Sequence, residues 1–105
     1  MTNKEANEFI KFLSDYNNFE YNLLKLSEEL SELDCEIKRY FTKPPANKKE
    51  LKEFNKKIVE ESGDVKYRLE ILVNSFGKEL VDKRIIKKLK KLEEHYQAGK
   101  YKHKL

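Results

Sequence analysis

Apolar side chains recur at every third or fourth residue along most of the chain, a spacing that places them on one face of an α-helix. Four such stretches, separated by asparagine, proline or glycine, predict helices over about residues 2–16, 19–41, 47–77 and 79–97. With 3 glycines and 2 prolines, the composition argues against a turn-rich β fold. We therefore expect an all-α fold, an antiparallel four-helix bundle forming a single domain over residues 1–105, with residues 98–105 as a flexible tail.

Residues near the ends of these stretches support the boundaries. Residues 2–5 read T-x-x-E, the capping box that begins many helices. Pro44 and Pro45 end the second helix, because proline lacks the amide donor and restricts the residue before it. Asn47, with a glutamate three residues on, repeats the capping pattern, and Gly77 suits a left-handed cap at the end of the third helix.

The apolar stripes identify the expected core positions. In the first helix these are Phe9, Leu13 and Tyr16. In the second helix they are Phe19, Leu23, Leu26, Leu30, Leu33, Ile37 and Tyr40. In the fourth helix they are Val81, Ile85, Leu89, Leu92 and Tyr96.

Charged residues interrupt the stripe of the third helix. The stripe runs through Phe54, Ile58, Glu61, Val65, Arg68 and Leu72. A carboxylate at a seam position costs several kcal/mol unless it is paired or bound to a metal. Asp64 lies one turn beyond Glu61, towards the edge of the same face. The seam of the third helix is therefore a candidate site for chemistry.

Acidic residues also follow one flank of the leucine stripe in the second helix. At about 100° per residue, Glu29, Glu32 and Glu36 fall along this flank, whereas Glu28 points further towards solvent. If the second and third helices pack antiparallel, Glu29 and Glu32 face the acids of the third helix. A divalent cation would relieve the repulsion between them. All-oxygen ligands favour Mg²⁺, with Mn²⁺ as a substitute.

A simpler interpretation needs no metal. Glu61 could pair with Arg68 or with a lysine, and the acids of the second helix could be solvated. Periodicity alone leaves these two alternatives open.

Composition bears on the oligomeric state and the cellular compartment that we expect. Hydrophobic residues make up 38% and charged residues 40%, so the core is thin and a homodimer or homotetramer is expected to complete it. Cys35 is the single cysteine and allows no internal disulfide, which suits a reducing compartment. No signal-like or membrane-spanning apolar run is present, so we expect a soluble cytoplasmic protein with no membrane partner.

Charge is distributed unevenly along the chain. Residues 28–36 carry five carboxylates and no cation, whereas residues 83–91 carry six cations and no acid. Two solvated helix faces would explain these blocks. A site for cations and a basic face for phosphates would explain them as well.

Two motifs resemble those of a known family. Residues 25–33 read K-L-S-E-E-L-S-E-L and residues 60–65 read E-E-S-G-D-V, including a glycine before the aspartate. In this order they resemble the E-E-x-x-E and E-x-x-D motifs of the MazG-like all-α nucleoside triphosphate pyrophosphohydrolases. The similarity covers about residues 20–77 and extends loosely through residues 88–101, which are similar to the C-terminal helix of small phage-type members.

The resemblance implies a reaction and a set of roles. A nucleoside triphosphate, with ribose or deoxyribose, would be hydrolysed to the monophosphate and pyrophosphate. The implied metal ligands are Glu29, Glu32, Glu61 and Asp64. Glu28 is the catalytic candidate, to orient or deprotonate the attacking water or to hold a second ion. The candidate phosphate contacts are Lys25, Arg68, Lys88 and Lys91, although for Lys25 a salt bridge to Glu28 or Glu29 is the favoured alternative.

Three other classes of protein could account for parts of this sequence. A di-iron carboxylate bundle requires E-x-x-H pairs, which the chain lacks. A non-enzymatic helical interaction or regulatory protein would use the stripes as coiled-coil seams, but Glu61 at a seam position speaks against it. A nucleic-acid-binding protein would explain the basic residues 83–104 and leave the acidic cluster unexplained, so nucleic acid is not the expected partner.

Overall fold

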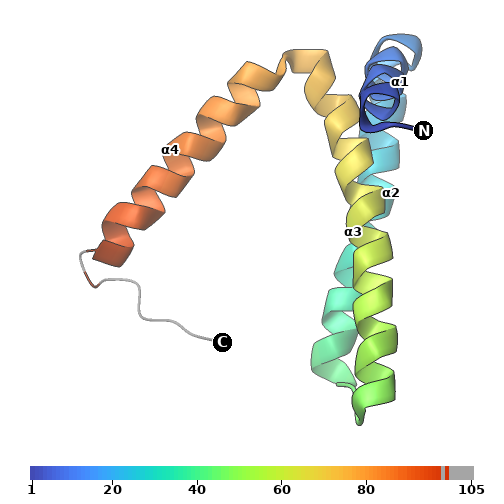
Figure 1. The fold of residues 1–105 in the computed structure, drawn as a ribbon, viewed down its shortest axis with the longest axis vertical. Coiled ribbons are helices and arrows are strands. Elements are labelled where there is room, and N and C mark those ends of the chain that lie inside the picture. The colour runs from blue at the N-terminus through green and yellow to red at the C-terminus, as the bar shows by residue number, and fades with distance from the viewer. Residues whose placement is uncertain (98, 100–105) are drawn as a thin grey trace. The chain divides into compact units, whose positions relative to one another are not determined.

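The computed structural model describes residues 1–97 and 99, and within them the chain forms four helices and no strand. The helices are α1 (Asn3–Tyr16), α2 (Phe19–Thr42), α3 (Lys48–Phe76) and α4 (Lys78–Gln97) (Figure 1). The predicted all-α fold is therefore confirmed, and each helix begins and ends close to its predicted limits. Apart from Gly99, the tail predicted over residues 98–105 lies outside the described residues.

Side-chain caps explain where three of the helices begin. Before α1, the Thr2 hydroxyl accepts a hydrogen bond from the Glu5 amide at 3.1 Å, and the Glu5 carboxylate accepts one from the Thr2 amide at 3.0 Å. The Asn18 side chain caps α2 by accepting from the amide of Tyr21 at 2.7 Å. At α3, the amide three residues beyond Asn47 donates to its side chain at 2.9 Å. These bonds satisfy amides that have no partner within a helix.

α2 and α3 pack side by side and antiparallel, joined by a short corner through Pro44 and Pro45 (Figure 1). Their register follows from an aromatic contact near the corner, where the rings of Tyr40 and Phe54 lie 5.1 Å apart between centroids. Counting back from this contact at 3.6 residues per turn brings the acidic middle of α2 opposite the acidic middle of α3. The fold therefore brings the two motifs of the sequence together.

The described chain divides into two compact units. The first, Met1–Ser75, contains α1, α2 and almost all of α3, and the second begins at Phe76 and contains α4. Gly77 links α3 to α4 with a φ of +99°, a left-handed conformation that glycine adopts without strain, as expected for this cap. Within the described residues, no helix combines the length and the apolar character that crossing a membrane requires.

Burial corrects the predicted core of α1 and α2. Leu26 and Ile71 are the two buried apolar residues of the described chain, and Ile71 is fully buried. Phe9 and Tyr16 are exposed, because α1 turns a face with Ile10 and Leu13 inwards instead. Most of the α2 stripe is also at least 40% exposed, namely Phe19, Leu23, Leu30, Ile37 and Tyr40. In α3, by contrast, every predicted seam position is buried or half-buried.

The α2 stripe is exposed because α3 packs against its flank. The most buried positions of α2 are Asn22, Leu26 and Glu36, which recur at helical spacing beside the leucines. α3 therefore covers the acidic flank and leaves much of the neighbouring leucine face open.

Candidate metal centre

Three carboxylates converge where the middles of α2 and α3 meet. Glu29 and Glu32, one turn apart on α2, and Glu61 on α3 each offer an oxygen, and these oxygens all lie within 4.8 Å of one another. Glu61 is buried, Glu29 is half-buried and Glu32 is exposed, so the group runs from the seam to the surface. The spacing of three on α2 and the antiparallel register together produce this convergence.

Two oxygens of the cluster lack partners although they are buried. Oε2 of Glu29 and Oε2 of Glu61 are shielded from solvent and accept no hydrogen bond from the described residues. A buried acceptor without a partner costs about 1–3 kcal/mol, and more when it carries charge. Carboxylate oxygens that converge in this way are the ligands preferred by hard divalent cations such as Mg²⁺. The donor set therefore fits a metal ion.

Electrostatics in the cluster disfavour the charged form of one member. The pKa of Glu29 is raised, first by burial and then by the negative charges of Glu32, Asp64 and Glu61. Asp64 is half-buried and close enough to Glu29 to contribute to this shift. Four acids thus act on one another here, and a bound cation would remove the conflict.

Glu61 also has a lysine partner. The ammonium of Lys57, one turn earlier on α3, lies 3.3 Å from Oε1 of Glu61, and this hydrogen bond raises the pKa of Lys57. The interpretation in which Glu61 pairs with a lysine is therefore correct for one of its oxygens. Oε2 remains without a partner, so the lysine and a metal ion would occupy different sides of the same carboxylate.

The remaining predicted residues on α2 and α3 lie around this cluster. Glu28 is exposed and pairs with Lys25 at 3.3 Å, as the simpler interpretation of Lys25 expected. Arg68 is half-buried one turn beyond Asp64, with its guanidinium 4.9 Å from the centre of the Tyr67 ring and its Nε shielded without a hydrogen-bond partner. Lys25, Glu28 and Arg68 are therefore neighbours of the cluster along the helices rather than members of it.

The other two candidate phosphate contacts, Lys88 and Lys91, lie on α4 in the second unit. Their proposed role stays a prediction.

Sequence reasoning placed Glu36 on the acidic flank of α2 but missed two other polar residues, Asn22 and Lys57. Asn22 is only 2% exposed, and its Oδ1 accepts a hydrogen bond from Asn17 at 3.2 Å while its Nδ2 has no partner among the described residues. Lys57 pairs with Glu61. Glu36 is buried and pairs with Arg39 at 3.5 Å. Asn22, Glu29 and Glu36 recur every seven residues, so the polar face of α2 was visible in the sequence but was secondary to the leucines.

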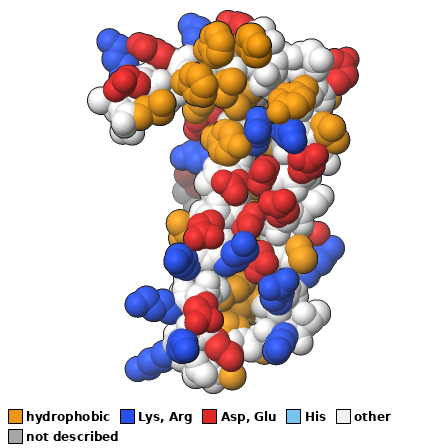
Figure 2. Space-filling model, turned by 90° about the vertical axis from the view of Figure 1, so that its right-hand side faces the viewer, with side chains coloured by type: hydrophobic (Ala, Val, Ile, Leu, Met, Phe, Trp, Pro, Cys, Tyr) orange, Lys and Arg blue, Asp and Glu red, His pale blue; other side chains and the backbone are white. Residues whose placement is uncertain are grey.

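Acidic side chains also dominate one face of the molecular surface. In Figure 2, red Asp and Glu side chains gather across the middle, hydrophobic side chains gather at the upper end, and Lys and Arg are frequent lower down.

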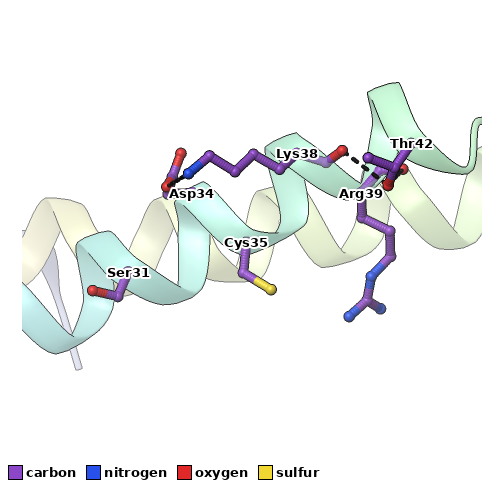
Figure 3. A pocket seen from close by; sticks show the side chains of 6 residues that line it. All are labelled: Ser31, Asp34, Cys35, Lys38, Arg39 and Thr42. Atoms are coloured by element: carbon purple, nitrogen blue, oxygen red, sulfur yellow. Dashed lines mark hydrogen bonds and ion pairs between the residues drawn. The ribbon is translucent and has the colours of Figure 1, made fainter.

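A hollow of about 460 Å³ lies on a different face of α2. Its lining comes entirely from α2, from Ser31, Asp34, Cys35, Lys38, Arg39 and Thr42 (Figure 3). At 100° per residue, Ser31, Asp34 and Lys38 lie roughly opposite Glu29 around the helix, whereas Arg39 lies at the edge of this hollow towards the seam. Within the hollow, Lys38 pairs with Asp34 at 2.8 Å. This hollow is therefore separate from the carboxylates.

Comparisons of the chain with models of protein families, with curated proteins and with solved structures gave no match. The chemistry of the seam and the motifs of the sequence are therefore the features that bear on function.

Proposed function

We propose that this protein is a Mg²⁺-dependent pyrophosphohydrolase that converts a ribo- or deoxyribonucleoside triphosphate to the monophosphate and pyrophosphate. One observation carries the proposal: carboxylates from α2 and α3 converge within 4.8 Å, and two of their buried oxygens have no hydrogen-bond partner among residues 1–97 and 99. The resemblance of both motifs to the MazG-like family supports the choice of reaction. Mn²⁺ is expected to substitute for Mg²⁺.

The residues around the seam would have three roles: binding the metal ion, activating the water and contacting the phosphates. Glu29, Glu32, Glu61 and Asp64 would hold the ion, which when bound would neutralise charge on the phosphate oxygens. Glu28 is exposed beside the cluster and pairs with Lys25. On release from Lys25 it would orient or deprotonate the attacking water. Lys25 and Arg68 would contact phosphate oxygens, and Lys88 and Lys91 are further candidates for that role.

The proposal includes a homodimer or homotetramer in the reducing cytoplasm. Its support is the leucine face of α2, where Leu23, Leu30 and Ile37 are each more than 40% exposed. Covering this face in a second copy would bury apolar area that a single chain leaves in water.

The test is pyrophosphate release from a panel of nucleoside triphosphates, measured with Mg²⁺ and with EDTA. Release should require the metal and should fall at least about hundredfold in Glu61→Gln, because even residues that only support a metal ligand are worth about 10–100-fold. Glu60→Gln is the matched control, since Glu60 is the exposed neighbour of Glu61 and should keep its activity.

Two other outcomes would redirect the proposal. Mn²⁺ binding without hydrolysis of any triphosphate would leave a metal site and refute the pyrophosphohydrolase activity. Absence of metal binding by folded protein would refute the metal centre. It would favour the second candidate, a helical interaction protein, which the exposed leucine face of α2 supports.

A further inference from the structure

A second hollow, of about 340 Å³, begins one helical turn from the carboxylate cluster. It lies between the C-terminal part of α2 and the N-terminal part of α3, close to the proline corner. Glu36 and Lys57 form its edge nearest the cluster, since they stand four residues from Glu32 and Glu61. Its volume is at the lower end of the range for small-molecule pockets, about 300–1,000 Å³.

Aromatic rings form part of its wall. Tyr40 and Phe54 line the hollow, and their rings contact each other at 5.1 Å with a tilt of 42°. Because the rings already touch, no flat molecule fits between them. Tyr40 also meets the Phe41 ring edge-to-face, with 5.3 Å between centroids, and Phe54 supports it from the seam. It is nevertheless 40% exposed, and this exposed part of the side chain is what the hollow offers to a stacking partner.

The charges of the hollow nearly cancel. Its lining includes three cations, Arg39, Lys43 and Lys57, and three acids, Glu36, Glu50 and Glu53. Two of the cations are already paired, Arg39 with Glu36 at 3.5 Å and Lys57 with Glu61 at 3.3 Å. A balanced lining with an open ring suits an uncharged aromatic group better than a polyphosphate.

The hollow also lies at a suitable distance from the cluster. Tyr40 stands eight residues beyond Glu32 on the same helix, about 12 Å along the axis. Lys57 lies between them on α3, where its ammonium could contact a phosphate without leaving Glu61. A nucleotide with its phosphates at the carboxylates can therefore reach Tyr40 with its base.

We infer that this hollow is the nucleoside pocket of the protein, in which the base stacks on the exposed part of Tyr40 and Lys57 contacts the adjoining phosphates. The inference rests on the proposed function, because that function supplies the nucleotide. It adds the location of the base, the residue on which it stacks and the side of the cluster from which the substrate enters.

The experiment compares Tyr40→Leu, Tyr40→Phe and Phe54→Leu with the wild-type protein. Each is assayed for Mn²⁺ binding alone, for the KM of the best triphosphate, and for binding of nucleoside 5′-monophosphates and of ribose 5-phosphate. Tyr40→Leu should raise KM and weaken monophosphate binding about tenfold, because base stacking on an aromatic ring is worth about 1–3 kcal/mol. Tyr40→Phe should retain affinity, and Phe54→Leu should have the smaller effect. Mn²⁺ binding should not change.

Controls separate this inference from the proposed function. Ribose 5-phosphate lacks the base, so its binding should be weak and insensitive to Tyr40→Leu. Phe12→Leu removes an exposed ring on α1 and should behave like the wild-type protein. Metal-dependent hydrolysis with an unchanged KM in Tyr40→Leu would overturn the pocket and leave the function intact. If the wild-type protein hydrolyses nothing, monophosphates that bind and lose affinity in Tyr40→Leu would still support the pocket, and monophosphates that do not bind would refute it.

Discussion

Two neighbouring faces of α2 reverse the usual distribution of polar and apolar residues. The face packed against α3 carries Asn22, Glu29 and Glu36, two of them buried and Glu29 half-buried. The adjacent face carries Leu23 and Leu30, both more than 40% exposed. Helix–helix packing normally buries the leucines and leaves the carboxylates to solvent. Here the contact between α2 and α3 encloses acids.

The difference between these faces has a physical consequence. Burying carboxylates costs free energy, whereas burying a leucine side chain contributes about 1.5–3 kcal/mol. A seam lined by carboxylates contributes little to the free energy of unfolding, but it supplies oxygen atoms that could bind a metal ion. The stabilising role falls to the leucine face, which is why we expect another copy of the chain to cover it.

The largest effect is expected when the seam between α2 and α3 is made apolar. Glu61→Leu removes the central buried ligand, so Mn²⁺ affinity measured by calorimetry should fall more than about hundredfold. The metal-free protein should become more stable to urea, because apolar replacements of buried charged groups are often stabilising by about 1–4 kcal/mol. Glu60→Leu is the control and should leave Mn²⁺ affinity unchanged. Retained affinity in Glu61→Leu would show that the carboxylates do not form the metal site.

The opposite change makes the leucine face polar. Leu30→Asp should dissociate the expected dimer or tetramer, because it would place an unpaired charge in an apolar interface. Sedimentation velocity should then show a monomer at concentrations at which the wild-type protein is assembled. Leu24→Asp is the control, because Leu24 is 58% exposed on a different side of α2 and should not affect assembly. A wild-type protein that is monomeric at high concentration would contradict the role given to this face.

A smaller effect is expected from Gly63, inside α3. A Cβ atom built there would meet no atom within 4 Å, and the residue has no positive φ. Gly63→Ala should therefore stabilise the protein by about 1 kcal/mol, the usual difference between the two residues within a helix. Urea unfolding measures this gain, and Mn²⁺ affinity should not change. A loss of stability would mean that Gly63 serves a contact that this chain does not make by itself.

The smallest effect concerns pH and a single side chain. The pKa of Glu29 is raised above its ordinary value of 4.5 by burial and by neighbouring acids. Between that value and the raised one, the folded protein binds more protons at this site than the unfolded chain. The contribution of Glu29 to the free energy of unfolding therefore falls as pH rises through this window.

Urea unfolding in EDTA across that pH window provides the measurement. Glu29→Gln should flatten the slope, and saturating Mg²⁺ should restore stability at neutral pH. The same slope in Glu29→Gln and in the wild-type protein would assign it to other groups.

The helices could be predicted well because local signals determine them. The T-x-x-E box, Asn18, the two prolines and Gly77 act on their own neighbourhoods, so the sequence alone indicates where each helix begins or ends. The approach of Glu29 and Glu32 to Glu61 followed from helical periodicity and an antiparallel pairing. The motifs added the order of the residues and the reaction that we propose.

Other features depended on packing that no local pattern specifies. Which flank of α2 meets α3 determines that Leu23 and Leu30 are exposed and that Asn22 is buried. Several lysines lie near the acids in the sequence, and only the packed structure shows that Lys57 is the one that pairs with Glu61. The inward face of α1 likewise depends on the surface it meets, which is why Phe9 was assigned to the core wrongly.

The four proposed metal ligands lie within residues 29–64, on two helices joined by a short proline corner. Glu32 and Glu61 are 29 residues apart in the chain, but the contact of Tyr40 with Phe54 nearer the corner spans only 14, so a hairpin that pairs from the corner outwards loses little loop entropy at each step. Pro44 and Pro45 reduce that loss further by limiting the conformations of the unfolded corner. The proposed metal ligands should consequently assemble as the α2–α3 hairpin closes, before the expected association of chains. A newly made subunit could then bind its ion while still alone.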